Sequence, residues 1–157
     1  HEAAQNLPLD ETNQLLFDKL AIAQGSRVAM VGYFGPLMDA FAARGAELEV
    51  IDEARGIGSS SDFYPKLDTW ADVLFLTSTS ILNATTEDIL SRSSPKVRTV
   101  MLGPSTPMVP EAFAHLPVAM LAGTVPMEPQ GVFQAVRNGA GTRVIQKFSH
   151  KVYADLA

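Results

Sequence analysis

Hydroxyl and amide side chains follow directly after a run of apolar residues near the middle of the chain. Thr77, Ser78, Thr79 and Ser80 stand in succession, and Asn83 comes three positions later. These side chains both donate and accept hydrogen bonds, which suits a polar, anionic or hydroxylated ligand. The same residue types also cap the ends of strands and helices. We therefore predict ligand contacts here, with capping as the structural alternative.

A second group of this kind follows a later apolar run. Gly103, Ser105 and Thr106 lie within the sequence Gly-Pro-Ser-Thr-Pro. Ser105 does not stand in a Gly-x-Ser-x-Gly turn, and no His–Asp pair is placed to activate it, so the pattern does not indicate a serine nucleophile. We predict hydrogen bonds from these residues to the same ligand. No catalytic residue set is recognisable in the chain.

A corner bounded by two glycines precedes both groups. It consists of Gly32, Tyr33, Phe34 and Gly35, and Pro36 follows it. The dinucleotide-binding fingerprint Gly-x-Gly-x-x-Gly is absent, and two bulky aromatic residues stand where glycines would be needed. Pro36 also lacks the amide N–H that would face a phosphate. The corner therefore argues against NAD or FAD and predicts one wall of a site for a smaller ligand.

Two acidic residues follow the corner at a distance that has a meaning in nucleotide-binding folds. In those folds an acidic residue about 20 positions after the glycines binds the ribose hydroxyls. Asp52 and Glu53 stand close to that distance after Gly32. An adenosine-containing ligand bound through Glu53 or Asp52 is therefore an alternative.

Metal ligands are sparse in this sequence. The chain has no cysteine and only three histidines, which are widely separated, whereas soft heavy metals prefer thiolate or imidazole ligands. The carboxylates of Asp52, Glu53 and Asp62 would hold only a hard cation, and weakly. We predict no metal site formed by the chain itself. The lack of cysteine is also typical of a cytoplasmic protein, which is the location we predict.

The overall composition is that of a globular protein. Of the 157 residues, 46% are hydrophobic and 18% are charged, which predicts one domain with its own core. The net charge of −5 argues against nucleic acid as a partner. No apolar run approaches the roughly 20 residues of a transmembrane helix, which argues against a membrane partner. Arg143, Lys147 and Lys151 are expected to form a solvated basic surface.

Strand-like and helix-like patterns alternate along the chain. The apolar runs predict strands over 27–31, 47–53, 72–77, 97–102 and 118–124. Helices are predicted over 12–24, 36–44, 85–92, 110–115 and 129–138, the third of them capped by Thr85. The segment 54–68 is expected to be an irregular loop, and 144–148 a final edge strand or a docked tail. Residues 1–11 are expected to be a linker or the remnant of a preceding domain, and 12–157 a single Rossmann-like domain.

These elements predict a three-layer α/β fold of the Rossmann-like, doubly wound type. The first strand is apolar without alternation, which is typical of a parallel strand buried on both faces. Alternating strands and helices then predict a mostly parallel sheet of five or six strands in the order 2-1-3-4-5. Ligands bind such sheets at the carboxyl ends of the strands, where the order reverses. This reversal brings 32–35 opposite 77–83, with 103–106 alongside.

Several motifs, taken together, resemble a known family. They are Val-Gly-Tyr-Phe-Gly-Pro at 31–36, Asp-Val-Leu-Phe-Leu-Thr-Ser-Thr-Ser-Ile-Leu-Asn at 72–83, Gly-Pro-Ser-Thr-Pro at 103–107 and the glycine-rich turn at 138–143. In this order they resemble the putative heavy-metal chelation domain family over about residues 25–150. The resemblance implies a Rossmann-like carboxyl-terminal domain, usually preceded by a domain like the amino-terminal domain of enolase. It also implies a cleft between the two domains.

Two functional hypotheses follow. The first is a small-molecule-binding domain that handles a metal complex or metallophore, as the resemblance implies. The alternative is an enzyme that uses an adenosine-containing cofactor, such as S-adenosylmethionine or a nucleotide, anchored by Asp52 or Glu53. The residues identify no particular cofactor. The expected partners are a small-molecule ligand and either an N-terminal domain or a partner subunit, with a homodimer as a further alternative.

Overall fold

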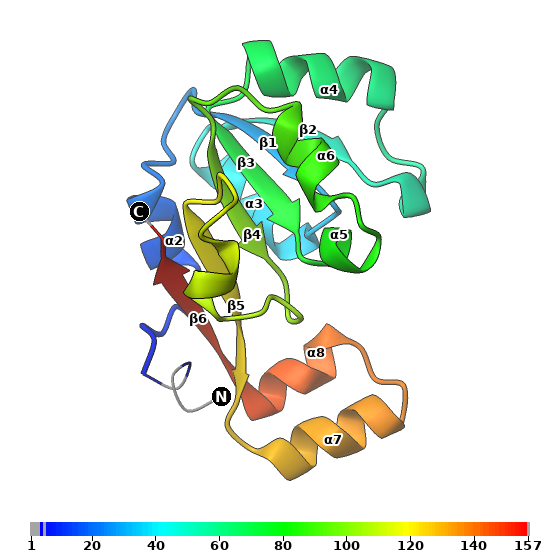
Figure 1. The fold of residues 1–157 in the computed structure, drawn as a ribbon. Helices are drawn as coiled ribbons and strands as arrows, with labels where there is room; N and C mark the ends of the chain where they lie inside the picture. The colour runs from blue at the N-terminus through cyan, green and yellow to red at the C-terminus, as the bar shows by residue number, and fades with distance from the viewer. Residues whose placement is uncertain (1–3, 5, 157) are drawn as a thin grey trace.

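A six-stranded sheet forms the centre of the molecule (Figure 1). The structure, a computed structural model, describes residue 4 and residues 6–156. The strands are β1 (Arg27–Val31), β2 (Glu47–Ile51), β3 (Val73–Thr77), β4 (Arg98–Leu102), β5 (Met120–Pro126) and β6 (Ser149–Asp155). They lie in the order β2-β1-β3-β4-β5-β6; the first five are parallel, and β6 is antiparallel to β5. This confirms the predicted α/β class and the order 2-1-3-4-5, with β6 added at the edge.

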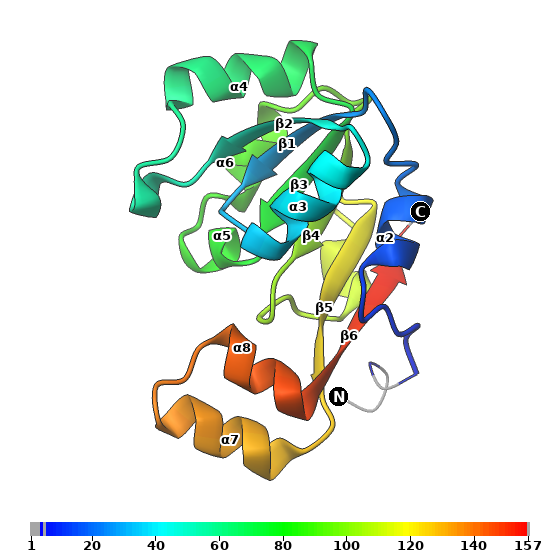
Figure 2. The ribbon, with the colours of Figure 1, turned by 180° about the vertical axis from the view of Figure 1, so that it is seen from behind.

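Helices cover both faces of the sheet and complete three layers. The helices α2 (Gln14–Lys19) and α3 (Gly35–Ala43) pack on one face, seen in Figure 2. The other face is covered by α4 (Ser60–Thr69), α6 (Thr86–Ser91) and the 3-10 helix η2 (Pro110–Phe113). β1 and β3 are therefore buried on both faces, which is the reason for their continuous apolar runs.

An aromatic cluster fixes the helices of the first face to the sheet. Phe41 of α3 packs edge-on against Phe17 of α2 and Phe75 of β3, with ring centroids 5.1 and 5.0 Å apart. All three side chains are fully buried. Each such aromatic pair adds roughly 0.5–1.5 kcal/mol to the free energy of burial. The cluster thereby fixes α3, and with it the glycine corner from which α3 begins.

The prediction of an irregular loop over 54–68 is wrong, because Ser60–Thr69 forms α4. Phe63 and Leu67 stand four positions apart, so that both lie on the buried face of this helix. Pro65 lies inside the helix and removes one backbone hydrogen bond, at a cost of roughly 3 kcal/mol. Burying each apolar side chain contributes roughly 1.5–3 kcal/mol. Burial therefore offsets the proline that suggested a loop.

The predicted final strand at 144–148 is also wrong, because these residues lie in helices and the edge strand begins only at Ser149. β5 starts at Met120 instead of 118 and extends to Pro126, since β6 pairs with all seven of its residues. β4 pairs with β5 only as far as Ala122. The remainder of the β5–β6 pair, Gly123–Pro126 with Ser149–Val152, therefore projects beyond the parallel sheet. We call it the β5–β6 arm.

Residues 127–148 form a small lobe at the end of this arm. The lobe contains α7 (Pro129–Arg137), α8 (Thr142–Ile145) and the 3-10 helix η3 (Gln146–Phe148). Figures 1 and 2 show α7 and α8 set apart from the rest of the molecule, below the strand ends. The prediction of a helix over 129–138 is confirmed, apart from its last residue.

Two element boundaries, one helix cap and one short helix also differ from the sequence-based expectation. The helix predicted over 12–24 is shorter, because the backbone turns after α2 through Ala21 at φ 54°. The second strand ends at Ile51, before the two acidic residues. Thr85 does not cap α6 through its side chain; instead its hydroxyl donates to the carbonyl oxygen of Ser80 at 3.4 Å. The short helix α5 (Thr79–Leu82) was not predicted.

The amino-terminal segment lies along β6. Of the residues predicted as a linker or domain remnant, 1–3 and 5 fall outside the described residues. Leu9 forms an isolated antiparallel bridge with Val152, and the N–H of Asp10 donates to the carbonyl oxygen of Lys151 at 3.0 Å. The segment thereby brings Asp10 to the base of the β5–β6 arm.

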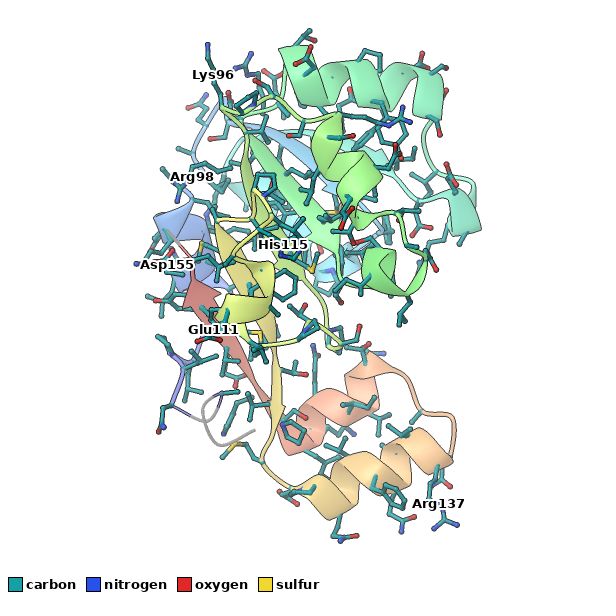
Figure 3. All side chains as sticks on the ribbon, in the orientation of Figure 1. Lys96, Arg98, Glu111, His115, Arg137 and Asp155 are labelled. Carbon is teal, nitrogen blue, oxygen red and sulfur yellow. The ribbon has the colours of Figure 1, made fainter. Side chains whose placement is uncertain are left out.

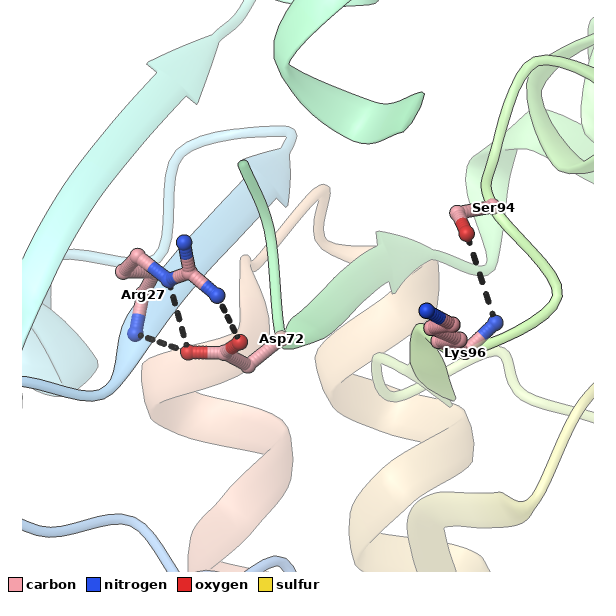
Figure 4. Close-up of polar contacts among 4 residues, drawn as sticks. All are labelled: Arg27, Asp72, Ser94 and Lys96. Atoms are coloured by element: carbon pink, nitrogen blue, oxygen red, sulfur yellow. Dashed lines mark hydrogen bonds and ion pairs between the residues drawn. The ribbon is translucent and has the colours of Figure 1, made fainter. Parts of the chain in front are cut away.

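The amino ends of the strands are held together by charged and polar contacts, shown in Figure 4. The guanidinium and the backbone N–H of Arg27 donate to the carboxylate of Asp72, which joins the starts of β1 and β3. These bonds hold the pKa of Asp72 below its ordinary value. None of the helices in the described part of the chain is long and apolar enough to cross a membrane.

Candidate functional site

A cleft of about 1220 Å³ lies at the carboxyl ends of β1, β3 and β4. This is the edge at which open parallel sheets bind ligands. Its opposite side is formed by residues of α8, η3 and β6. The predicted site residues that line the cleft are Gly32, Tyr33, Phe34, Gly35, Glu53, Thr77, Ser78, Thr79, Asn83, Gly103 and Ser105. The topology therefore brings together four separate segments of the sequence.

Thr106 is the predicted site residue that the structure places elsewhere. Its N–H donates to the carbonyl oxygen of Gly103 at 3.1 Å, and this turn directs the chain away from the cleft. Its side chain is buried and lines a separate hollow of about 190 Å³ with Met108 and Val109. The expectation that all of 103–106 lies alongside the strand ends is therefore corrected at Thr106.

The glycine corner is a rigid wall of the cleft. Gly32 has φ +90°, and a Cβ atom there would lie 2.9 Å from the Cβ of Thr77, so only glycine lets the two strand ends approach. The N–H of Tyr33 donates to a carboxylate oxygen of Asp52 at 3.0 Å. Asp52 also accepts the N–H of Arg55 at 3.2 Å and pairs with its guanidinium at 3.4 Å. The chain itself thus uses both oxygens of Asp52.

Glu53 occupies a different position from its neighbour. It is exposed, lines the cleft, and accepts a hydrogen bond from the hydroxyl of Ser60 at 3.0 Å. Because Asp52 holds the corner, Glu53 is the acidic residue at this strand end that is open to a ligand. The ribose-binding alternative therefore depends on Glu53.

Two pairs of hydroxyl groups form the polar wall opposite the corner. Thr77 and Thr79 are joined at 2.9 Å between their Oγ1 atoms, and Ser78 and Ser105 at 2.9 Å between their Oγ atoms. A hydroxyl has one donor and two acceptor positions, so each pair keeps one O–H donor after its internal bond. Ser80 differs, because its hydroxyl is buried against that of Thr86 at 2.8 Å. All four residues of the run border the cleft, but the hydroxyl of Ser80 is already bonded to Thr86 inside the fold.

Gly103 sets the spacing of the Ser78–Ser105 pair. Its φ is +143°, and a Cβ atom there would lie 2.5 Å from the Oγ of Ser78. The N–H of Ser78 also donates to the carbonyl oxygen of Leu102 at 2.9 Å, which ties the end of β3 to the end of β4. Ser78 is buried, whereas Ser105 is exposed. Ser105 is therefore open to the cleft, and Ser78 supports it from inside the fold.

Two of the three basic residues that were expected to form a solvated surface also line the cleft. Arg143 of α8 and Lys151 of β6 both reach it, and Lys147 does not. The Nζ of Lys151 donates to the carbonyl oxygen of Glu11 at 3.0 Å. The basic residues are recognisable as a group in the sequence. Their place in the cleft is not, because it depends on a lobe that the sequence patterns do not predict.

Tyr64 of α4 adds a further hydrogen-bonding group to the lining. Its ring lies 4.8 Å below the guanidinium of Arg92, and Arg92 in turn pairs with Asp88 at 3.0 Å. Burial, followed by the negative charge of Glu53, raises the pKa of Tyr64. Its phenol is therefore protonated at neutral pH and can donate.

The carboxylates of the cleft do not form a metal site. The four that line it are Asp10, Asp52, Glu53 and Asp88. Asp10 accepts the N–H groups of Leu15 at 3.2 Å and Leu16 at 2.8 Å, and so anchors the start of α2. Within residues 4 and 6–156, no three His, Cys, Asp or Glu side chains gather in a way that could hold a metal ion. The cleft offers hydrogen bonds rather than a coordination shell.

Comparisons with known proteins agree with this fold. The family model described as "Putative heavy-metal chelation" (DUF364) matches residues 15–155. A search of curated proteins found no match. A solved structure from Pyrococcus horikoshii is 21% identical with a TM-score of 0.72, and the match covers 83% of this chain and 54% of that chain. One from Desulfitobacterium hafniense is 19% identical with a TM-score of 0.74, covering 98% of this chain and 60% of that chain.

Both solved structures are described as proteins of unknown function from this family. At these identities the likeness shows the fold alone. This chain spans little more than half of their length, 54% and 60% respectively. Since the family model matches residues 15–155 of 157, the resemblance in the motifs is confirmed, and the chain belongs to the putative heavy-metal chelation family.

Proposed function

We propose that this chain binds a small organic chelate, with its metal already coordinated, in the cleft at the carboxyl ends of the strands. The observation that supports this most directly is the contrast within the cleft. It has hydroxyl pairs with O–H donors to spare, and the described residues have no cluster of metal-ligating side chains. A soft heavy metal needs thiolate or imidazole ligands, and these residues do not fit it. The metal that the family description implies therefore arrives with its own ligands.

The walls of the cleft suit such a ligand because they are already fixed. Asp52 holds the corner at Tyr33, and Gly32 lies in close contact with Thr77. Exposed donors at Thr79 and Ser105 then face a ligand without rearranging the backbone. A preorganised site of this kind loses little free energy to ordering when it binds.

A second candidate function is supported by the position of Glu53. It lies at the end of β2, next to the corner, and has a carboxylate that lines the cleft. This is the place of the ribose-binding acid in nucleotide-binding folds. The alternative is an enzyme that binds an adenosine-containing cofactor there. Against it, the N–H of Tyr33 is taken by Asp52 and Pro36 has none, so two of the amides that could face a phosphate are not available.

Calorimetric titration separates these functions. The probes are iron(III) citrate, a neutral iron(III) trihydroxamate complex, free Ni²⁺ and S-adenosylmethionine. Binding of at least one chelate, with no binding of free Ni²⁺, is the expected result. Thr79→Val and Ser105→Ala each remove a hydrogen bond and should weaken chelate binding by roughly ten-fold. Binding of S-adenosylmethionine that Glu53→Gln abolishes would support the second candidate, and binding of free Ni²⁺ alone would refute the first.

A further inference from the structure

The lobe of residues 127–148 is firmly attached to the β5–β6 arm. The N–H groups of Met127 and Glu128 both donate to the carbonyl oxygen of Phe148, at 2.9 and 3.1 Å. Gly131 of α7 packs so closely on the ring of Phe148 that a Cβ atom there would lie 2.4 Å away. The two ends of the lobe are thus joined at its base. The position of Arg143 beside the strand ends therefore follows from the folded arm.

Charge in the cleft is unevenly balanced. Two of its four carboxylates pair with a cation, Asp52 with Arg55 and Asp88 with Arg92, whereas Asp10 and Glu53 accept only from neutral donors. The three cations differ among themselves. Arg55 pairs with Asp52, whereas Arg143 and Lys151 pair with no carboxylate in the described part of the chain.

Lys151 lies close to an acidic residue, Glu11, but its ammonium group does not bind the carboxylate. The carboxylate of Glu11 accepts from the ring of His150 at 2.7 Å and from the backbone N–H of Lys151 at 3.2 Å. The ammonium group of Lys151 turns instead to the backbone carbonyl of Glu11, a neutral partner. Its positive charge in the cleft is therefore not compensated by the neighbouring acid.

We propose that Arg143 and Lys151 form an anion-binding subsite that recognises the carboxylate groups of the ligand; this rests on the function proposed above. The guanidinium of arginine matches a planar carboxylate with two parallel hydrogen bonds, and lysine adds a point charge. The corner is less suited to a phosphate, because Asp52 takes the N–H of Tyr33 and Pro36 has none. The ligand class is therefore a polycarboxylate chelate.

Matched variants test this subsite. Arg143→Gln and Lys151→Gln remove a cation from the cleft. Arg137→Gln and Lys147→Gln remove the same charge from the same region, but neither residue lines the cleft. Figure 3 shows Arg137 at the outer end of α7, pointing away from the rest of the chain. Arg143→Lys keeps the positive charge but removes the planar guanidinium with its two parallel donors. Circular dichroism verifies that each variant is folded.

The measurement is the dissociation constant of iron(III) citrate and of the neutral trihydroxamate complex at low and high NaCl. Each subsite variant should weaken citrate binding by roughly ten-fold or more, while the controls stay within about two-fold. Added salt should weaken citrate binding to the wild type more than to Arg143→Gln. The neutral complex should bind all variants alike.

Each other result has a defined meaning. If citrate binds and Arg143→Gln and Lys151→Gln behave like the controls, the subsite is wrong while the proposed function stands. If inorganic phosphate competes with citrate, and Arg143→Gln weakens phosphate binding more than citrate binding, the carboxylate assignment is wrong. If neither complex binds the folded wild type, the proposed function itself fails, and the subsite with it.

Discussion

Replacing Gly32 with alanine tests whether the glycine corner is a rigid wall of the cleft. Gly32 has φ +90°, and an alanine Cβ would lie 2.9 Å from the Cβ and 3.1 Å from the Cγ2 of Thr77. Thr77 stands at the end of β3, between β1 and β4 in the sheet, and cannot move alone. We therefore expect a stable fold in the wild type and a clear loss of stability in Gly32→Ala.

The magnitude has two parts. A left-handed backbone costs an L-residue roughly 1–2 kcal/mol. Forcing an extra methyl group into packed surroundings costs roughly 1–3 kcal/mol more. The free energy of unfolding should therefore fall by about 2–5 kcal/mol, which lowers Tm by on the order of 10 °C for a chain of this length. Urea and thermal unfolding followed by circular dichroism measure both quantities.

Gly139→Ala is the matched control. Gly139 has φ +67°, but an added Cβ would meet nothing within 4 Å, so this variant bears only the backbone cost of roughly 1–2 kcal/mol. The difference between the two variants isolates the contact with Thr77. Equal losses of stability in Gly32→Ala and Gly139→Ala would refute the argument that the corner is held by close packing.

Two further predictions concern carboxylates that the fold uses. Asp52→Ala removes the acceptor of the Tyr33 and Arg55 N–H groups and should lower the free energy of unfolding by about 1 kcal/mol in urea titrations, with Asp52→Asn closer to wild type. Hydrogen bonds from Arg27 lower the pKa of Asp72, so their stabilisation is present at neutral pH and lost as pH falls through that lowered pKa. Asp72→Asn should thus be less stable at pH 7 and should approach wild type in acid; a constant difference across pH would contradict this.

The buried centre of the fold could be predicted well from the sequence. The first strand is predicted over 27–31 and is observed there. Its three central residues are buried, because helices cover both faces of the sheet at this strand. Short continuous apolar runs of this kind are typical of strands in a parallel sheet that is covered on both faces. The carboxyl ends of β1, β3 and β4 then follow from the order of the sheet, and with them the meeting of the corner with the hydroxyl groups.

Elements at the periphery were harder to predict, for physical reasons that differ. Pro65 is a local signal against a helix, and it is outweighed by the burial of Phe63 and Leu67, which is a tertiary effect. Thr106 is itself a predicted ligand contact, yet one turn of the backbone sends it to a different hollow. Neither the helix at Pro65 nor the position of Thr106 can be predicted from the residues immediately around it.

The acidic pair after β2 shows how the site itself departs from the motif. Spacing alone treats Asp52 and Glu53 as equivalent candidates for ribose binding. In the structure the chain uses Asp52 to hold Tyr33 and Arg55, and only Glu53 faces the cleft without a cationic partner among the described residues. The spacing therefore selects two residues that line the cleft but does not distinguish their roles.

The charge of the cleft is the property that depends most on topology. The strand ends contribute hydroxyl groups and acids whose bonds are satisfied locally, whereas the cations come from α8 and β6, late in the chain. They reach the strand ends because β6 pairs antiparallel with β5 and projects with it beyond the sheet. The side of the cleft that they form has cations without a carboxylate partner, while the cleft as a whole is lined by four carboxylates and three cations. The excess of negative charge in the whole chain therefore agrees in sign with the formal charge of the lining, and the topology decides only where the cations stand.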